Sequence, residues 1–385
     1  MSRSSKCPGP ALRIRLVSGI ALFLASTLAV ADYGLNFQKP VSAIAQEQYS
    51  LHMLILGICV AIGVVVFGAM LYSIVMHRKD RGHKAAKWHE STTVEIIWTA
   101  IPFLILVGMA IPATGTLIKM EDTKGEADLV IKVTGYQWKW SYEYPNQNVS
   151  FFSTLATPRD QIDQHKNKIA LKDMNKDYLL EVDNPIVIPI GKKVRFIITA
   201  NDVIHAWWVP ALGVKKDAIP GFINETWARV DEPGTYRGQC AELCGKDHGY
   251  MPIVVKAVSD DEFTKWVSSK KAEMVASAAD AGKTWTKDDL MKRGEKVYQA
   301  CTACHGATGT GVPGVFPAIK GSKIATGPVD GHIGIVMKGK PGTAMQAFAG
   351  QLSDVDLAAV ITFQRNAFGN NTGDVVQPAQ IKAKR

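Results

Sequence analysis

The densest group of metal-ligand side chains lies in QCAELCGKDHGYM, the stretch Gln239–Met251. It places two thiols, an imidazole and a thioether within a dozen residues, at Cys240, Cys244, His248 and Met251. Zinc rarely recruits methionine, whereas a thioether beside thiolates and imidazole favours copper. One cysteine with His and Met would suffice for a single copper ion. The second cysteine offers a further bridging thiolate and predicts room for two copper ions.

Two other interpretations of this stretch stay open from its own residues. Cys240 and Cys244 could form a structural disulfide. The cysteines could instead hold zinc with His248, although a zinc site leaves Met251 without a role. A second histidine upstream, His205 in DVIHAW, weakens both alternatives because it completes a more specific pattern.

The complete pattern resembles the dinuclear CuA motif of subunit II of the haem-copper cytochrome c oxidases. All six positions of that motif are matched, by His205, Cys240, Glu242, Cys244, His248 and Met251. In the family both cysteines bridge the coppers, the histidines and the methionine complete the sphere, and the glutamate contributes its backbone carbonyl. The resemblance therefore implies a CuA ligand set here. It also implies a magnesium ion on the carboxylate of Glu242.

The charge and the cysteines of the chain argue against two classes of protein, those that bind nucleic acids and those held together by disulfides. The 385 residues have room for two or three domains, and they contain 44 Lys+Arg against 35 Asp+Glu. No Lys/Arg-rich run is interleaved with aromatic residues, so we expect no nucleic-acid binding. Cys7 and Cys59 lie apart, and the other four cysteines form two local motifs. That usage indicates cofactor chemistry in an exported domain rather than a disulfide framework.

Residues 1–31 have the features of a secretory signal peptide. A basic region and an apolar core are followed by Ala29-Val30-Ala31, a small-residue cleavage site. Cleavage after Ala31 would leave the amino end of the mature chain outside the cytoplasm. The alternative is a short first membrane helix, although the apolar run is too short to span comfortably.

The next part, residues 32–118, predicts a hairpin of two transmembrane helices at 51–76 and 94–118. The cationic loop between them, from His77 to Lys87, belongs on the cytoplasmic side by the positive-inside rule. Everything after the second helix then lies on the periplasmic side of a bacterial inner membrane.

Glu95 stands at the start of the second helix, in VEIIW. It could be an interfacial carboxylate at the positive end of a helix. It could also be a group through which protons enter, since ionisable residues near membrane segments are often functional. The segment resembles the family's Val-Glu-x-x-Trp, whose glutamate lies at the mouth of a proton channel in subunit I. The resemblance implies the same role for Glu95.

Residues 119–258 change to short β-branched and aromatic segments separated by turn signals. We expect strands at Leu129–Val133, Tyr178–Val182, Val194–Thr199, Thr226–Val230 and Ile253–Val255. This pattern predicts an all-β sandwich or barrel, and the resemblance implies a cupredoxin-like one.

An aromatic run, GYQWKWSYEY, falls in this domain at residues 135–144. Most aromatic residues in strands are core, which we expect for Trp140 and Tyr142. The resemblance implies that Trp138 is the surface point where electrons enter from cytochrome c. Lys139 follows it, where the family often has tyrosine.

Two acidic residues of the same domain, Glu143 and Asp202, match positions that help the family dock basic cytochrome c. Without the family they are solvated carboxylates. Lys139 puts that docking surface, though not the copper motif, in question.

A second unit of different composition, residues 286–370, follows a linker at 259–285 and precedes a tail at 371–385. It contains the C-x-x-C-H motif of covalent haem c attachment, Cys301-Thr302-Ala303-Cys304-His305. Both thiols of this motif bind the haem, and the histidine is an axial iron ligand. The alternatives are a redox CxxC or half of a zinc site.

The unit resembles a small class I cytochrome c. Thr286 and Ser353 can cap helices on either side of the haem motif. In that family the sixth iron ligand is a methionine in a Gly/Pro-rich loop before the last helix, which Met345 fits. The rival is Met337, within the apolar run His332–Met337 that predicts a packed helix.

Taken together, the chain is predicted to be a multidomain membrane protein. It has a two-helix transmembrane hairpin, an all-β cupredoxin-like barrel and a small all-α cytochrome c domain. It resembles an oxidase subunit II with a fused cytochrome c. The resemblance implies electron transfer from cytochrome c, through haem c and CuA, to subunit I, which reduces O₂ to water and pumps protons. Subunit III is a further expected partner.

Three other functions are weighed against the copper ligands, the haem attachment motif and the two membrane helices. A quinol oxidase subunit II would lack the copper ligands. A membrane-anchored copper-delivery protein would not need a haem attachment motif or Glu242. A periplasmic copper/haem electron carrier outside any oxidase would not need two membrane helices.

Overall fold

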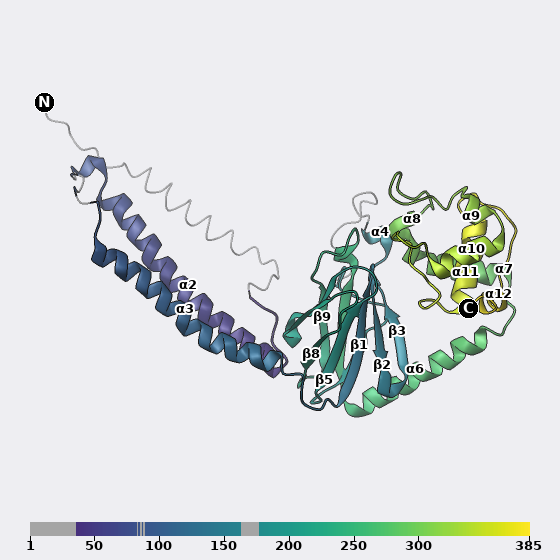
Figure 1. Cartoon of the computed structure of the whole chain (residues 1–385), viewed down its shortest axis with the longest axis horizontal. Helices are drawn as coiled ribbons and strands as arrows, with labels where there is room; N and C mark the ends of the chain where they lie inside the picture. The colour runs from purple at the N-terminus through teal and green to yellow at the C-terminus, as the bar shows by residue number, and fades with distance from the viewer. Residues whose placement is uncertain (1–35, 83, 85–86, 88, 163–176) are drawn as a thin grey trace, which may run out of the picture. The chain divides into compact units, whose positions relative to one another are not determined.

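A computed structural model of the chain describes residues 36–82, 84, 87, 89–162 and 177–385. The predicted signal peptide, residues 1–31, lies outside the described residues. The chain divides into two units, Met1–Lys39 and Pro40–Arg385. Within the second unit, a helical pair, a β domain and a helical domain follow one another along the chain (Figure 1).

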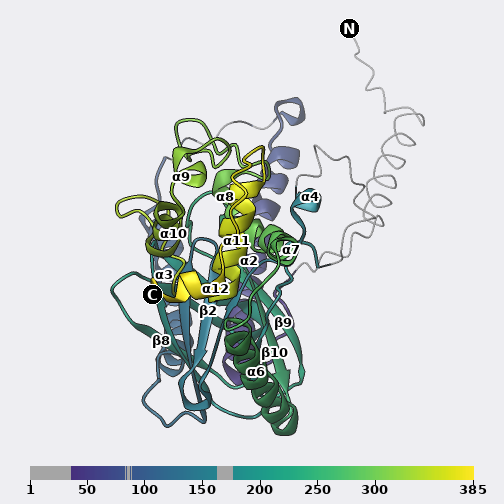
Figure 2. The same ribbon diagram turned by 90° about the vertical axis from the view of Figure 1, so that its right-hand side faces the viewer.

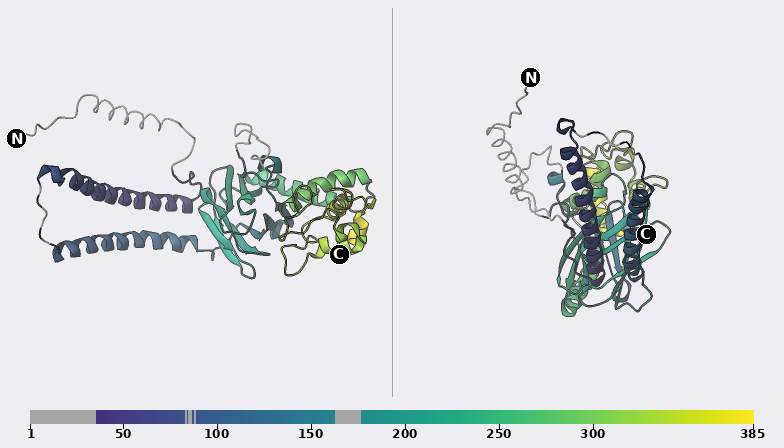
Figure 3. Two further views of the ribbon diagram at one scale, coloured as in Figure 1. Left: turned by 90° about the horizontal axis from the view of Figure 1, so that it is seen from above. Right: turned by 90° about the vertical axis from the view of Figure 1, so that its left-hand side faces the viewer.

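Two long apolar helices form the predicted hairpin, α2 (Ala43–Met76) and α3 (Thr92–Met120) (Figures 1 and 3). A short 3-10 helix, η1 (Lys79–Arg81), lies between them. Both long helices are apolar enough to cross a membrane, and none of their most apolar stretch is buried in the protein. Apolar helices of this length are stable in the hydrocarbon of a bilayer.

Both helices extend beyond the predicted 51–76 and 94–118, because polar contacts fix their outer ends. The Ser42 hydroxyl caps α2 by accepting a hydrogen bond of 3.0 Å from a backbone N–H of the first turn. At this end of the hairpin, the Lys119 amine of α3 pairs with the Glu47 carboxylate of α2 at 2.7 Å. The apolar part of each helix is therefore shorter than the helix itself.

The β domain consists of two five-stranded sheets, with the strand orders β3-β2-β1-β5-β8 and β4-β10-β9-β6-β7. Their bounds are β1 Leu129–Tyr136, β2 Lys139–Tyr144, β3 Val149–Ser153, β4 Ile186–Pro189, β5 Val194–Ala200, β6 His205–Val209, β7 Val214–Ala218, β8 Asn224–Ala228, β9 Gly234–Cys240 and β10 Pro252–Val258. The β1–β5 and β4–β10 pairs are parallel, and the other pairs are antiparallel. Short helices occupy several of the connections: η2 Pro145–Gln147, α4 Arg159–Ile162, η4 Pro210–Leu212 and η5 His248–Tyr250.

The core of this domain follows the two-residue period of its strands. Alternate residues of β5 are buried, among them Phe196 and Ile198. Trp140 and Tyr142, predicted as core, have no exposed surface, and the Trp207 indole N–H donates to the Tyr142 hydroxyl at 3.2 Å. The predicted all-β cupredoxin-like architecture is confirmed.

One predicted strand, Tyr178–Val182, is wrong. The segment forms turns, with a single bridge between Val182 and Leu155. Leu179 has a φ of 61°, in the left-handed region that interrupts an extended backbone. The segment therefore forms a loop despite its apolar composition.

The predicted linker at 259–285 contains a 21-residue helix, α6 (Asp260–Asp280). Ser259 begins it with a capping box, in which its hydroxyl and the Glu262 carboxylate each satisfy a backbone N–H. Trp266 of this helix packs against Tyr144 at a ring separation of 5.1 Å. The helix thus covers part of the β domain.

The helical domain contains α7 Lys287–Tyr298, η6 Gln299–Cys301, α8 Thr302–His305, α9 Lys323–Thr326, α10 Val329–Lys338, α11 Asp354–Asn366 and α12 Pro378–Lys382 (Figure 2). Thr286 and Ser353 cap α7 and α11 with their side chains, as predicted. The two helices cross closely at Gly294, where a Cβ would lie 2.2 Å from the Ala359 carbonyl oxygen.

Candidate copper site and haem-attachment site

The predicted ligand stretch is the loop between β9 and β10. Its ends are tied together because the Cys240 N–H donates to the Met251 carbonyl at 3.0 Å. The Cys240 and Cys244 sulfurs lie 3.8 Å apart, well beyond the roughly 2.05 Å of a disulfide bond. Both cysteines are free thiols and are buried.

His205 reaches this pair from the first residue of β6. Its Nδ1 lies 3.9 Å from the Cys240 sulfur, and the side chain has no exposed surface. One ligand atom from each of His205, Cys240 and Cys244 falls within 4.8 Å of the others, a spacing that could hold a metal ion.

The other predicted ligands lie in the same loop. His248 Nδ1 lies 3.5 Å from the Cys244 sulfur. The Cys240 thiol donates to the Glu242 carbonyl at 3.4 Å, while the Glu242 side chain is exposed. Met251 is buried in the same core cluster as both cysteines. The donor set is soft overall, with two sulfurs, two imidazoles and a thioether nearby, and it fits copper better than a hard cation.

Asp202 fixes the orientation of His205. Its Oδ1 accepts from His205 Nε2 at 2.9 Å, so the proton sits on Nε2 and the Nδ1 lone pair faces the sulfurs. Burial lowers the pKa of His205, but the hydrogen bonds with Asp202 and Cys240 outweigh this and raise it.

The contact between the two sulfurs shifts the pKa values of the two thiols in opposite directions. The hydrogen bond with Cys244 is the main cause that lowers the pKa of Cys240, with a smaller contribution from His205. The same hydrogen bond, followed by burial, raises the pKa of Cys244.

Gly135 provides the space for the His205 ring. A Cβ at this position would lie 2.8 Å from His205 Cδ2, closer than van der Waals contact permits. The sequence signal for this role is an isolated glycine inside a strand pattern, which is typical of close approach. The identity of the approaching group comes only from the structure.

The aromatic run touches the cysteine loop directly. The Trp138 indole N–H donates to the Cys244 carbonyl at 3.1 Å, and the Gln137 amide donates to the same oxygen at 2.8 Å. Trp138 is half-buried. No pattern in the sequence predicted that Gln137 contacts the cysteine loop.

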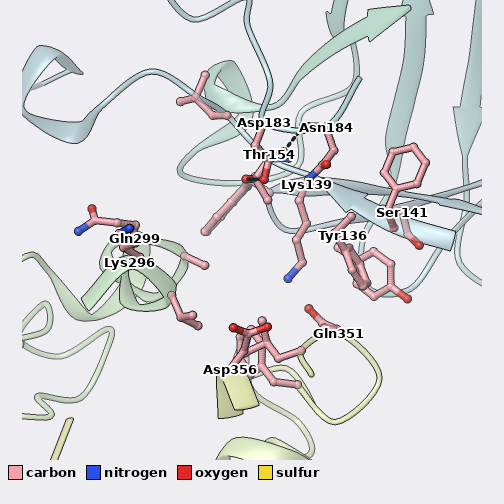
Figure 4. A pocket seen from close by; sticks show the side chains of 18 of the residues that line it. Tyr136, Lys139, Ser141, Thr154, Asp183, Asn184, Lys296, Gln299, Gln351 and Asp356 are labelled. Atoms are coloured by element: carbon pink, nitrogen blue, oxygen red, sulfur yellow. Dashed lines mark hydrogen bonds between the residues drawn. The ribbon is translucent and has the colours of Figure 1, made fainter. Parts of the chain in front are cut away.

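Lys139 is 8% exposed, and its amine lies over the Phe152 ring at 4.8 Å and the Phe348 ring at 5.2 Å. Burial lowers its pKa to about 8. It lines a cavity of about 1160 Å³. Figure 4 shows its amine pointing into this space, toward Gln351 and Asp356 of the helical domain.

The C-x-x-C-H motif lies on η6 and α8, and the side chains of Cys301 and Cys304 are half-buried. His305 Nδ1 donates to the Pro317 carbonyl at 2.8 Å, which leaves the Nε2 lone pair for a metal. This tautomer suits an imidazole that binds a metal through Nε2. Pro317 is twelve residues downstream and carried no signal in the sequence.

The two candidate methionines differ in environment. Met337 lies in α10, is 3% exposed and belongs to the hydrophobic core of the helical domain. Met345 lies in the loop between α10 and α11 and is half-buried. The predicted packed helix at His332–Met337 is confirmed as part of α10.

Glu95 belongs to the helical hairpin. It lies in the first turn of α3 with its side chain exposed, and its backbone N–H donates to the Ser91 carbonyl at 3.0 Å. An acidic residue in a first helical turn is stabilised by the helix dipole.

Three family profiles match the chain. Residues 30–114 match "Cytochrome C oxidase subunit II, transmembrane domain", and residues 129–258 match "Cytochrome C oxidase subunit II, periplasmic domain". Residues 289–363 match "Cytochrome C oxidase, cbb3-type, subunit III".

Individual proteins are similar over about two thirds of the chain. "Probable cytochrome c oxidase subunit 2" of Rickettsia bellii (strain RML369-C) is 41% identical over 259 residues, 66% of this chain and 92% of the relative. "Cytochrome c oxidase subunit 2" of Cereibacter sphaeroides is 35% identical over 273 residues, 66% of this chain and 90% of the relative. The crystal structure of the periplasmic domain of subunit II of cytochrome oxidase of Bradyrhizobium japonicum has 45% sequence identity. The match covers 39% of this chain and 97% of the chain in the crystal structure, with a TM-score of 0.34.

Proposed function

Because the chain belongs to the subunit II family of the cytochrome c oxidases, we propose that it carries electrons through a covalent haem c and a dinuclear CuA centre to oxidase subunit I. The donor is a cytochrome c, and subunit I reduces O₂ to water coupled to proton pumping. The observation that carries this proposal is the buried convergence of His205, Cys240 and Cys244 in a chain that also has a C-x-x-C-H motif.

The copper ligands we propose are the two bridging thiolates, both imidazoles, the thioether and one backbone carbonyl: Cys240, Cys244, His205, His248, Met251 and Glu242. When bound, the copper pair supplies a one-electron redox centre. The chain's own contribution is rigidity, since buried ligands on two paired strands need not move when the metal charge changes.

The haem ligands we propose are Cys301 and Cys304 for covalent attachment, with His305 and Met345 on the iron. The hydrogen bond from His305 to Pro317 supports this, because it holds the imidazole in the required tautomer. Thioether ligation by Met345 would raise the haem potential, which suits a donor to an oxidase.

The remaining roles follow from the family. The chain is anchored in a membrane by α2 and α3. We propose that this is the bacterial inner membrane, with the copper and haem domains on the periplasmic side. Glu95 would then lie where protons enter subunit I, Trp138 where electrons reach the copper domain, and Glu242 beside a magnesium ion. Subunit III is a further proposed partner.

The test uses the purified oxidase complex with the variant Cys244→Ser and the matched control Cys59→Ser, an exposed cysteine in α2. We expect two copper ions and one haem c per wild-type chain beyond those of subunit I. We expect Cys244→Ser to lose both copper ions and cytochrome c oxidation, while Cys59→Ser keeps them. Full activity of Cys244→Ser would contradict the proposal.

A further inference from the structure

The loop that carries the proposed haem ligand Met345 touches the copper domain through the next residue. The Gln346 amide nitrogen donates to the Gln137 carbonyl and to Asp202 Oδ2, both at 3.0 Å. A primary amide has two N–H donors, so this contact uses both of them. Gln346 and Asp202 lie 144 residues apart in the sequence.

Asp202 continues this contact to the copper site. Its Oδ2 also accepts from the Gln137 N–H at 2.8 Å. Its Oδ1 accepts from the Val203 N–H at 2.7 Å and from His205 Nε2 at 2.9 Å. One carboxylate thus joins the amide of Gln346 to the imidazole of a proposed copper ligand.

The orientation of the Gln346 amide is itself fixed. The Gln351 amide donates to Gln346 Oε1 at 3.2 Å and to the Ala347 carbonyl at 2.7 Å. Because the oxygen of Gln346 faces a donor, its nitrogen must face Asp202 and Gln137.

Two further contacts join the same surfaces. The Lys246 amine, in the cysteine loop, donates to the Ala303 carbonyl inside the C-x-x-C-H motif at 2.6 Å. The buried Lys139 amine lies between Phe152 of the β domain and Phe348 of the helical domain. These contacts bring the domains together, but only the Gln346 contact reaches a copper ligand through a single intervening side chain.

We propose that Gln346 is the positioning residue for electron transfer between the haem and the copper pair of this chain. The step moves one electron from ferrous haem iron to the oxidised copper pair, with no bond or proton transferred. The tether along α6 raises the local concentration of the haem domain but does not select its orientation. Gln346 selects it, by docking the methionine loop on the Asp202 carboxylate. The inference rests on the proposed function.

The test compares wild-type oxidase with Gln346→Leu, which removes both donors at similar volume. The matched control is Gln299→Leu, an exposed glutamine of the same domain. Two quantities are measured: the rate of haem-to-copper electron transfer after flash reduction of the haem, and hydrogen exchange of peptides covering 135–140 and 343–350.

We expect Gln346→Leu to slow electron transfer about tenfold and to speed exchange in both peptides about tenfold, equivalent to about 1.4 kcal/mol of docking free energy. Copper content, haem spectrum and both midpoint potentials should match wild type, which a merely structural role would not predict. Gln299→Leu should resemble wild type. Unchanged rate and exchange in Gln346→Leu would overturn the inference.

A second variant covers the case in which Gln346→Leu loses a cofactor. Gln351→Met removes the donor that orients the Gln346 amide, together with its hydrogen bond to the Ala347 carbonyl, and it should slow electron transfer while both centres stay loaded. An unchanged rate in Gln351→Met would then overturn the inference. If wild-type complex lacked the copper pair or the haem, the proposed function would fail instead, so the two failures are distinguishable.

Discussion

Asp202 Oδ1 and His205 Nε2 are joined by a hydrogen bond of 2.9 Å, with the imidazole fully buried and the carboxylate 16% exposed. This contact turns the Nδ1 lone pair of His205 toward the cysteine sulfurs. It indicates a structural role for Asp202 at the proposed copper site, beyond the docking of cytochrome c that the resemblance implies.

We therefore expect Asp202→Asn to weaken copper binding about 10- to 100-fold, as is typical when a hydrogen-bond partner of a metal-bound histidine is lost. Competitive copper titration of the detergent-solubilised chain measures this. The control is Asp217→Asn, an exposed carboxylate on β7. Equal affinities of the two variants would show that Asp202 does not support His205.

The space beside His205 gives a second prediction. Gly135→Ala would place a Cβ 2.8 Å from the imidazole, so the ring or the strand must shift. We expect a loss of about 1–3 kcal/mol in the free energy of unfolding of the β domain, the usual cost of overpacking, together with reduced copper content. Denaturant unfolding and metal analysis measure the two effects.

Gly249→Ala is the matched control, because its Cβ would meet open space. If Gly135→Ala bound copper and unfolded like this control, the close approach of the strand to His205 would be unimportant.

The choice of the sixth haem ligand gives a third prediction. Met345→Ala should abolish the thioether–iron charge-transfer band in the absorption spectrum and lower the haem potential. Met337→Leu should keep the band, because it preserves the volume of a buried core side chain. Persistence of the band in Met345→Ala, with its loss in Met337→Leu, would transfer the role to Met337.

A buried histidine outside the C-x-x-C-H motif predicts that acid destabilises the helical domain. His332 is 3% exposed, and its Nε2 lies 2.8 Å from Gln364 Oε1. Burial, with a smaller contribution from Arg365, lowers its pKa to about 4. Between about pH 6.5 and 4, His332 is protonated in the unfolded chain but stays neutral in the folded chain. The free energy of unfolding therefore decreases as the pH falls through this window.

The expected loss from this residue is up to about 3 kcal/mol across the window. Denaturant unfolding of the full chain, followed by haem absorbance at several pH values, measures it. His332→Gln keeps a hydrogen-bonding side chain but should flatten this part of the pH dependence, while His89→Gln should not. An unaltered pH slope in His332→Gln would contradict the assignment.

The parts of the fold with strong local signals were predictable from the sequence. Apolar length marked α2 and α3, and the hydroxyls of Thr286 and Ser353 marked the starts of α7 and α11. The Tyr178–Val182 strand was wrong because local composition does not report the left-handed conformation of Leu179.

For the candidate site, the sequence predicted the ligand residues from their types and spacing, but not the contacts that support them. The soft ligand set pointed to copper. The supporting contacts join residues far apart in the chain with no periodic pattern, as the contact of Gln346 with Asp202 illustrates. The hydrogen bond from His305 to Pro317 likewise involves a backbone carbonyl, which every residue has.

The most direct test of the central claim, that Cys240 and Cys244 bridge a copper pair, is electron paramagnetic resonance of the oxidised complex with copper analysis. We expect one unpaired electron shared equally by two copper nuclei, and its loss in Cys240→Ser. A signal from a single copper nucleus, or a disulfide between these cysteines in active enzyme, would contradict the claim.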